Sequence, residues 1–244
     1  MVTAAPGASD PHVAIEGGRA LLDAQAATLV MSIRRAKGPE DPVEILIVGE
    51  GRVEPARGLG HLQLDLSGML AIPGTTASPS PDWIIEVIWT PDQLHARVPA
   101  RPNDTWTSRS RADARTGSGL VGRLPDEVLG LVKLVATSRP DQIVALEDER
   151  IDGEAARRWL VRVPVESAVA EGVPAEVPDT SALLDSYGVE AIDVEVWLVD
   201  GAVRRLRYEI SREHAPYGGP DRTTVTYDWS SAAGAEPIVV PTPS

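Results

Sequence analysis

Apolar and polar residues alternate along much of this chain, and a period of two predicts β-strands. The first such stretch is residues 43–48, which is mostly apolar, and Gly49-Glu50-Gly51 after it indicates a bend or bulge. Two further sets of apolar residues alternate with polar ones: Leu62, Leu64 and Leu66, then Trp83, Ile85, Val87 and Trp89. With residues 93–98 after the Pro91-Asp92 turn, these segments predict a meander of four antiparallel strands.

Residues 194–210 alternate on both sides of Asp200-Gly201, the strongest short-range signal of a β-hairpin. A plain two-residue turn pairs Val199 with Ala202, whereas a bulge at Gly201 pairs Leu198 with Ala202. The bulged register separates apolar from charged residues more cleanly on the two faces of the hairpin. A slip of one residue would move every side chain to the opposite face. We therefore expect the bulged register, with one face formed by Val194, Val196, Leu198, Ala202, Leu206, Tyr208 and Ile210. Trp197 lies on the charged face, and we expect it to pack under Arg205 and Arg207.

A helical period appears in two longer segments. In residues 18–35 the apolar residues Leu22, Ala26, Leu29 and Ile33 fall on one stripe. Residues 124–138 predict a second helix, with Pro125 in its first turn and Asp126 and Glu127 suited to its N-terminus. A short helix is expected at 180–187, and the polar segment 103–119 is expected to be irregular.

Further strands are predicted at 143–151 and 156–165, which the Asp152-Gly153 turn joins, and at 223–229 and 238–241. The total is roughly eight to ten strands and two or three helices. This order predicts an α+β fold, with a large curved antiparallel sheet covered by two or three helices. Residues 1–16 are expected to form a flexible leader, and residues 17–241 a single domain.

Composition narrows the possible functions. The net charge of −13 argues against binding nucleic acid or an anionic membrane surface. The 244 residues include no Cys, which excludes disulfides and thiolate chemistry. Aromatic residues make up 4% of the chain and none is Phe, so a large sheet either closes on small side chains or leaves an apolar cavity. An ordinary filled core is the more common outcome of such a pattern.

Catalytic and metal-binding patterns are weak. The four His are dispersed without the spacing of a zinc site, and no nucleophile elbow for a serine hydrolase is present. The acidic residues 147–149 lack the pattern of a calcium-binding loop. We therefore expect no catalytic residue, metal or cofactor, and no enzymatic activity. The first eleven residues lack the basic start and apolar run of a signal peptide, which favours either a cytoplasmic protein or a processed or truncated form.

Three segments carry a resemblance to a known family: LPDEVLGLVKLVATS, ERIDGEAARRWLVRV and VEVWLVDGAVRRLRYEI. Their order resembles the LolA/LolB-like superfamily and, within it, the actinobacterial LprG/LppX-type lipoproteins. The resemblance implies a half-open barrel closed by helices, whose hollow interior binds acyl chains of a lipid, glycolipid or lipid-anchored protein. It also implies an extracytoplasmic location in the cell envelope, although the signal peptide and lipid-modified Cys of that group are absent from this sequence.

The first hypothesis is therefore a non-enzymatic lipid carrier or chaperone, with a LolA-like lipid-binding domain at residues 17–241. Its partners would be acyl chains and a membrane transporter or lipoprotein, with no nucleic acid. The residues expected to line the cavity are Leu22, Ala26, Leu29, Leu64, Leu66, Ile85, Val87, Trp89, Leu129, Val132, Val161, Val196 and Leu198. The alternative is an envelope interaction or sensory module with the same fold and a filled core, which binds a protein partner and no lipid.

Overall fold

The computed structural model describes residues 10–36, 43–70, 83–100, 105–117, 119–173, 190–212, 221–232, 234 and 236–241. The described α-helices are α1 (His12–Leu22), α2 (Arg111–Gly117), α3 (Gly119–Thr137) and α4 (Val165–Ala170). The first six strands are β1 (Ala27–Ala36), β2 (Glu44–Glu54), β3 (Leu59–Asp65), β4 (Ile84–Trp89), β5 (Gln93–Arg97) and β6 (Thr107–Ser110). The other six are β7 (Ile143–Ala145), β8 (Glu149–Ile151), β9 (Glu154–Pro164), β10 (Ala191–Val199), β11 (Ala202–Arg212) and β12 (Asp221–Ser231).

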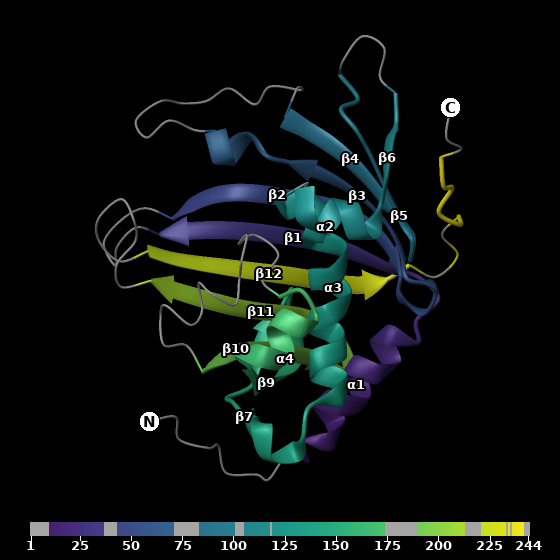
Figure 1. Cartoon of the computed structure of the whole chain (residues 1–244). Helices are drawn as coiled ribbons and strands as arrows, with labels where there is room; N and C mark the ends of the chain where they lie inside the picture. The colour runs from purple at the N-terminus through teal and green to yellow at the C-terminus, as the bar shows by residue number, and fades with distance from the viewer. Residues whose placement is uncertain are drawn as a thin grey trace.

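The twelve strands form one antiparallel sheet with the order β6-β5-β4-β3-β2-β1-β12-β11-β10-β9-β7, and β8 pairs with β9. The first half is a meander in sequence order, and the second half returns from β12 to β7. The two halves join where β1 pairs with β12, so the first and last strands meet in the middle of the sheet (Figure 1). This is the α+β antiparallel fold that the alternation predicts.

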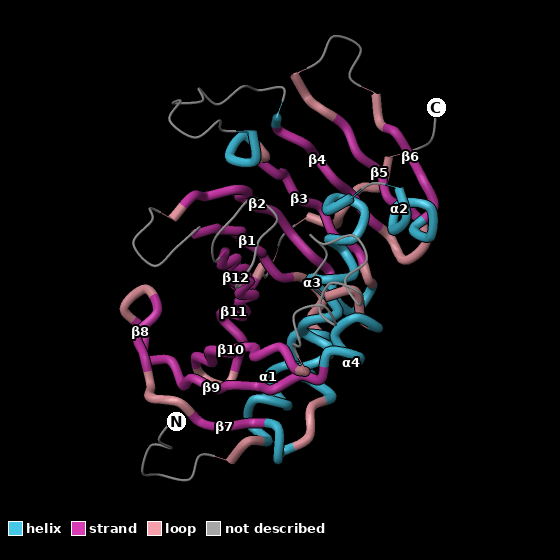
Figure 2. The backbone as a smooth tube through the Cα atoms, turned by 60° about the vertical axis from the view of Figure 1, so that its left-hand side comes forward, coloured by secondary structure: helices cyan, strands magenta, loops and turns pink. Residues whose placement is uncertain are grey.

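The sheet is strongly curved and does not close, because β6 and β7 stand at opposite ends of the strand order. Figure 2 shows the bend from β4, β5 and β6, through the central strands, to β9 and β7, with the helices on its concave side. Four described helices cover this side, one more than the upper expectation of three. The main core lies between them and the concave face.

The register of the central strands explains the apolar concave face. Leu29 pairs with Trp229, Met31 with Tyr227, and all four are buried. Because side chains alternate across a strand, the residues between them point to the outer face. The same alternation continues through β9 and β10, where Val161 pairs with Val194.

The helix predicted over 18–35 is wrong beyond Leu22. The structure ends α1 at Leu22 and begins β1 at Ala27, so Leu29 and Ile33 are strand residues. A helical period and a strand period both place Leu29 and Ile33 on the same face, so these two residues fit either structure. Met31 is also buried, and only the strand period of two explains this. The leader expected over 1–16 is also corrected, because α1 begins at His12 and buries Ala14 and Ile15.

The hairpin of β10 and β11 forms, but its register differs from the expected one. Val199 pairs with Ala202 across a two-residue turn, in which Asp200 and Gly201 have φ of 50° and 81°. These values fit a type I′ turn, which matches the twist of the strands. The irregularity lies further along, where Trp197 pairs with Arg205 and Leu198 with Val203. The extra residue is Arg204, so Val203 joins the core and Ala202 is exposed.

Several other boundaries differ from the sequence-based ones. The segment 103–119 contains β6 and α2, α3 begins at Gly119 with Pro125 in its interior, and α4 follows β9. Residues 143–151 form two strands, β7 and β8, and 238–241 form none. β2 continues through Gly49 and Gly51, because glycine leaves room there for close neighbours such as Met31 and the carbonyl of His61. The expected helix at 180–187 lies outside the described residues.

Candidate functional site

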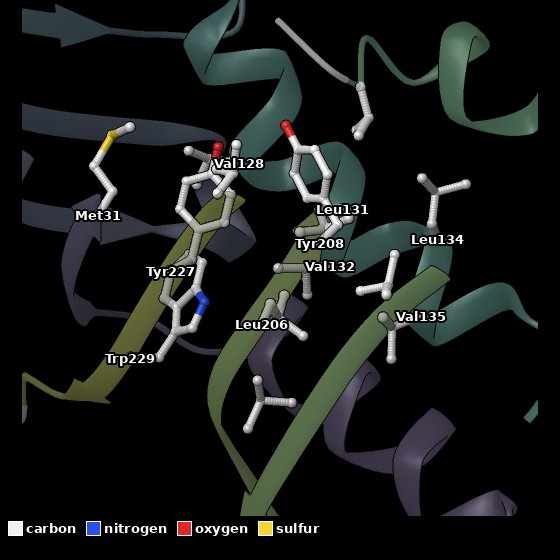
Figure 3. Close-up of a cluster of buried hydrophobic side chains, with 14 of the residues drawn as sticks. Met31, Val128, Leu131, Val132, Leu134, Val135, Leu206, Tyr208, Tyr227 and Trp229 are labelled. Atoms are coloured by element: carbon white, nitrogen blue, oxygen red, sulfur yellow. The ribbon is translucent and has the colours of Figure 1, made fainter. Parts of the chain in front are cut away.

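The concave face of the sheet and helix α3 meet in an apolar interface. Figure 3 shows Val128, Leu131 and Val132 of α3 beside the aromatic and aliphatic side chains of β11 and β12. The sheet side of this interface includes Met31, Leu206, Tyr208, Tyr227 and Trp229, all buried. The helix face is built by Leu124, Val128, Leu131 and Val135, at spacings of three and four residues. Aliphatic contact therefore holds α3 over the hollow of the sheet.

The thirteen residues expected to line a cavity lie mostly inside this core. Eight are 2% exposed or less: Leu29, Leu64, Val87, Trp89, Val132, Val161, Val196 and Leu198. Leu22, Leu66, Ile85 and Leu129 are partly buried and pack against the same core. Ala26 is half-buried just before β1. The structure thus brings these residues together between the sheet and the helices, where side chains fill the described space.

A buried carboxyl group interrupts the apolar interface. Glu127 in α3 has no exposed surface, and its Oε1 accepts hydrogen bonds from the hydroxyls of Tyr208 and Tyr227, each at 2.5 Å. The two tyrosines come from β11 and β12, so this cluster fixes the position of α3 along the sheet. The sequence pattern placed Glu127 at the helix N-terminus, but the helix begins eight residues earlier at Gly119. Its position midway between Leu124 and Leu131 was the available signal that it faces the core.

A cleft of about 610 Å³ lies among α2, α3, α4 and the end of α1. Its charged lining consists of Arg111, Arg115, Arg123, Asp126, Lys133 and Glu171, and its apolar lining includes Leu22, Leu129 and Val169. Of the residues expected to line a cavity, Leu22 and Leu129 reach this cleft. The cations of the cleft were not predicted, because Arg111 and Arg115 lie in the segment expected to be irregular. Their spacing of four residues, the spacing of neighbours on a helix face, was the signal.

Carboxylates hold Arg111, Arg115 and Lys133 of the cleft. Asp126 accepts from Arg115 at 2.6 Å and 2.8 Å and also pairs with Arg111, while Lys133 pairs with Glu171. Arg111 is 9% exposed. Burial lowers the pKa of Arg111 more than the charge of Asp126 raises it, and the nearby charge of Arg115 lowers it further. An arginine nevertheless stays protonated near neutral pH, so Arg111 is a buried cation.

The outer face of the sheet carries a cluster of ion pairs around Trp197. Trp197 is 1% exposed there, beneath the guanidinium groups of Arg158, Arg205 and Arg207, which lie 5.1, 5.9 and 5.0 Å from its ring centroid. The expected packing of Trp197 under Arg205 and Arg207 is confirmed. Its indole N–H donates to Glu149 at 3.0 Å. These contacts bury Trp197 under a polar cluster on the outer face, next to the apolar side chains of Ile151, Ala156 and Val199.

A second outer-face cluster centres on Glu86, which contacts His61 at 2.6 Å and Arg97 at 2.5 Å. Burial alone would raise the pKa of Glu86. Hydrogen bonds and charges from Arg97 and His61 outweigh burial and bring the pKa below its ordinary value of 4.5. The folded state therefore favours the ionised form.

Replacing Glu86 by glutamine is expected to lower the free energy of unfolding at neutral pH and to have a smaller effect at a pH well below 4.5. A carboxyl whose pKa is lowered on folding stabilises the fold above its unfolded pKa. That contribution is lost as the pH falls below 4.5 and through the folded value. Urea unfolding at both pH values measures the difference, with the exposed Glu147→Gln as the control. An equal effect of Glu86→Gln at both pH values would contradict this account.

The described part of the chain offers neither a metal cluster nor a membrane-spanning helix. Among the described residues, no group of three or more His, Asp or Glu could hold a metal ion. Within the described ranges, no helix has the length and apolar character needed to cross a membrane.

Exposed apolar side chains gather near the start of β2. Gly68 packs there against the carbonyl of Ile45, and Leu66 N–H donates to the carbonyl of Trp83. These contacts bring the start of β2 close to the segments that follow β3 and precede β4. The exposed cluster comprises Val43, Ile45, Met69 and Trp83.

Comparison with solved structures identifies the fold. The structure matches LprF from Mycobacterium bovis with a TM-score of 0.55 at 14% identity, over 98% of this chain and 99% of that chain. Lipoprotein LppX from Mycobacterium tuberculosis matches with a TM-score of 0.48 at 14% identity, over 91% and 95% of the two chains. No family model and no curated protein matches the sequence. The chain thus shares its fold, a half-open sheet covered by helices, with LprF, and the fold that the sequence resemblance implied is confirmed.

Proposed function

We propose that this protein is a non-enzymatic carrier that binds acyl chains of a lipid, glycolipid or lipid-anchored protein. The observation that carries the proposal is the continuous apolar concave face of an unclosed sheet, in the fold of LprF. The acyl chains would lie between this face and helix α3. The fold also supports a location in the cell envelope, outside the cytoplasm, with a membrane transporter or a lipoprotein as the protein partner.

Binding needs α3 to separate from the sheet, since side chains fill the described interface. The helix residues that would leave the sheet are aliphatic, among them Val128, Leu131 and Val132. An acyl chain offers the same surface chemistry, so it can take their place against the concave face. Each CH₂ group removed from water contributes about 0.8 kcal/mol. A chain of roughly 16 carbons therefore supplies about 12 kcal/mol before the costs of ordering and of moving α3.

The second candidate is an interaction module that binds a protein and no lipid. The filled core favours it, because eight of the expected cavity residues are at most 2% exposed. The exposed apolar cluster of Val43, Ile45, Met69 and Trp83 would then be the natural place for a partner. The two candidates differ in where an acyl chain meets the protein, and a labelling experiment separates them.

The test is photolabelling of the full chain with a diacyl phospholipid that carries a diazirine in one acyl chain. The carrier proposal expects adducts on concave-face peptides of α3, β11 and β12, around Val132, Leu206 and Tyr227. Each adduct is assigned to a residue. The outer-face residues Trp197 and Arg205 are the internal control, since the carrier proposal expects no adducts there. Adducts confined to Ile45, Met69 and Trp83, or no adducts at all, would overturn the carrier proposal and favour the interaction module.

A further inference from the structure

Positive charge gathers in the helix-lined cleft of an otherwise acidic protein. The whole chain has a net charge of −13. The described lining of the cleft holds four cations and two carboxylates, a net charge of +2. The cations are Arg111 and Arg115 from α2 and Arg123 and Lys133 from α3, and Lys133 is one of two lysines in the sequence. Such a concentration of one sign within a concave site raises the local concentration of ligands of the opposite sign.

The arginines are held in place before any ligand arrives. Asp126 binds Arg115 in a bidentate manner and also pairs with Arg111, so both guanidinium groups are anchored from one side. Arg123 Nε donates to the backbone carbonyl of Arg115 at 3.0 Å, which ties α3 to α2. A guanidinium with a fixed plane binds phosphate or carboxylate with less loss of side-chain entropy than a mobile one.

Arg111 is a buried cation in the lining of the cleft. It is nine-tenths buried and lines the cleft, and its Nε–H has no hydrogen-bond partner among the described residues. Asp126 is shared between two arginines and leaves this side of the cleft short of negative charge.

The other wall of the cleft is apolar and continuous with the main core. Leu22, Leu129 and Val169 line the cleft, and each also packs against the core beneath the helices. Three prolines, Pro55, Pro91 and Pro125, complete this wall. The cleft therefore has a cationic side and an aliphatic side that leads toward the place where acyl chains would lie. An inorganic anion would use the first side alone, whereas an anionic amphiphile would use both.

We propose that this cleft binds the anionic headgroup of an amphiphile, a phosphate or carboxylate group attached to acyl chains. The inference rests on the proposed carrier function and names the class of its ligand. Arg111, Arg115, Arg123 and Lys133 contact the anion, and Leu22, Leu129 and Val169 contact the first methylene groups. The chain as a whole is negatively charged, so the local positive charge of the cleft favours it as the place where an anionic headgroup binds.

The test compares two short-chain lipids that differ in one group, a diacylglycerol and the same diacylglycerol phosphate. Binding to the full chain is measured by titration calorimetry below the concentration at which each lipid forms micelles. The phosphate lipid is expected to bind about tenfold more tightly, and the difference is expected to shrink as salt is added. Equal affinity for the two lipids would overturn the headgroup site and leave the carrier function standing. Binding of neither lipid would overturn the carrier function itself.

The double variant Arg123→Gln/Lys133→Gln is expected to remove most of this preference and to keep the affinity for diacylglycerol unchanged. An unchanged affinity for the neutral diacylglycerol shows that the variant is folded. The matched control is Arg150→Gln/Arg204→Gln, which removes the same charge from the outside of the β8–β11 region and is expected to change neither affinity. The last measurement is competition between inorganic phosphate and the phosphate lipid. If it displaces the phosphate lipid at a similar concentration, the cleft is a site for free anions and the amphiphile assignment is wrong.

Discussion

Replacing Glu127 by alanine is expected to lower the free energy of unfolding by about 3 kcal/mol. The carboxyl has no exposed surface and accepts hydrogen bonds from Tyr208 and Tyr227, at 2.5 Å each. Hydrogen bonds to a charged or buried partner contribute more than those at the surface, and the truncated side chain also leaves a void. Urea unfolding followed by Trp fluorescence measures the change.

Conservative substitutions in the same cluster distinguish how much each hydrogen-bonding group contributes to the free energy of unfolding. Tyr208→Phe removes one donor and is expected to cost about half as much as Glu127→Ala. Glu127→Gln keeps an acceptor oxygen at nearly the same place and is expected to cost about 1 kcal/mol. The control is Glu166→Ala on the exposed side of α4, with a change below about 0.5 kcal/mol. Losses of similar size for Glu127→Ala and Glu166→Ala would contradict the role of the cluster in holding α3.

Replacing Gly60 by alanine is expected to cost about 3 kcal/mol, because the added methyl group has no space. Gly60 in β3 pairs with Trp89 in β4, and a Cβ at Gly60 would overlap Cε2, Cζ2 and Cη2 of the indole ring. Trp89 is completely buried, so its ring cannot move aside into solvent. Strand backbone, indole and core would have to shift together.

A double-mutant cycle tests the cause of this effect. In a Trp89→Leu background the space above Gly60 is free, and Gly60→Ala is expected to cost about 1 kcal/mol or less. The unfolding free energies of the four proteins give the coupling between the two positions. A cost of Gly60→Ala that is equal in both backgrounds would show that the overlap with Trp89 is not its origin.

The strands were largely predictable, because a sheet that is buried on one face requires apolar residues at every second position. Leu62, Leu64, Val87 and Trp89 are all buried on the concave side, as the alternation required. The hairpin was predictable from Asp200-Gly201, but the position of its irregularity was not. An extra residue at Arg204 places Val194, Val196, Leu206 and Tyr208 on one face, and a bulge at Gly201 would do the same, so the alternation does not distinguish the two positions.

The site was less predictable than the fold. The concave face follows from the alternation, but whether its side chains fill the hollow depends on how closely α3 packs, which no local pattern encodes. The cationic cleft combines residues from α1, α2, α3 and α4, far apart in the sequence. Glu127 was assigned to a helix end because Pro125 suggested that the helix begins there, and a proline inside a helix is uncommon.

Native mass spectrometry of the protein, purified without added lipid and followed by organic extraction, tests the central claim most directly. The carrier proposal predicts a bound diacyl species that is released on extraction, and the cleft predicts that it carries a phosphate or carboxylate group. A ligand-free mass that stays unchanged after incubation with vesicles of diacylglycerol and of diacylglycerol phosphate would contradict the claim. The chain would then be an interaction module built on a filled half-barrel.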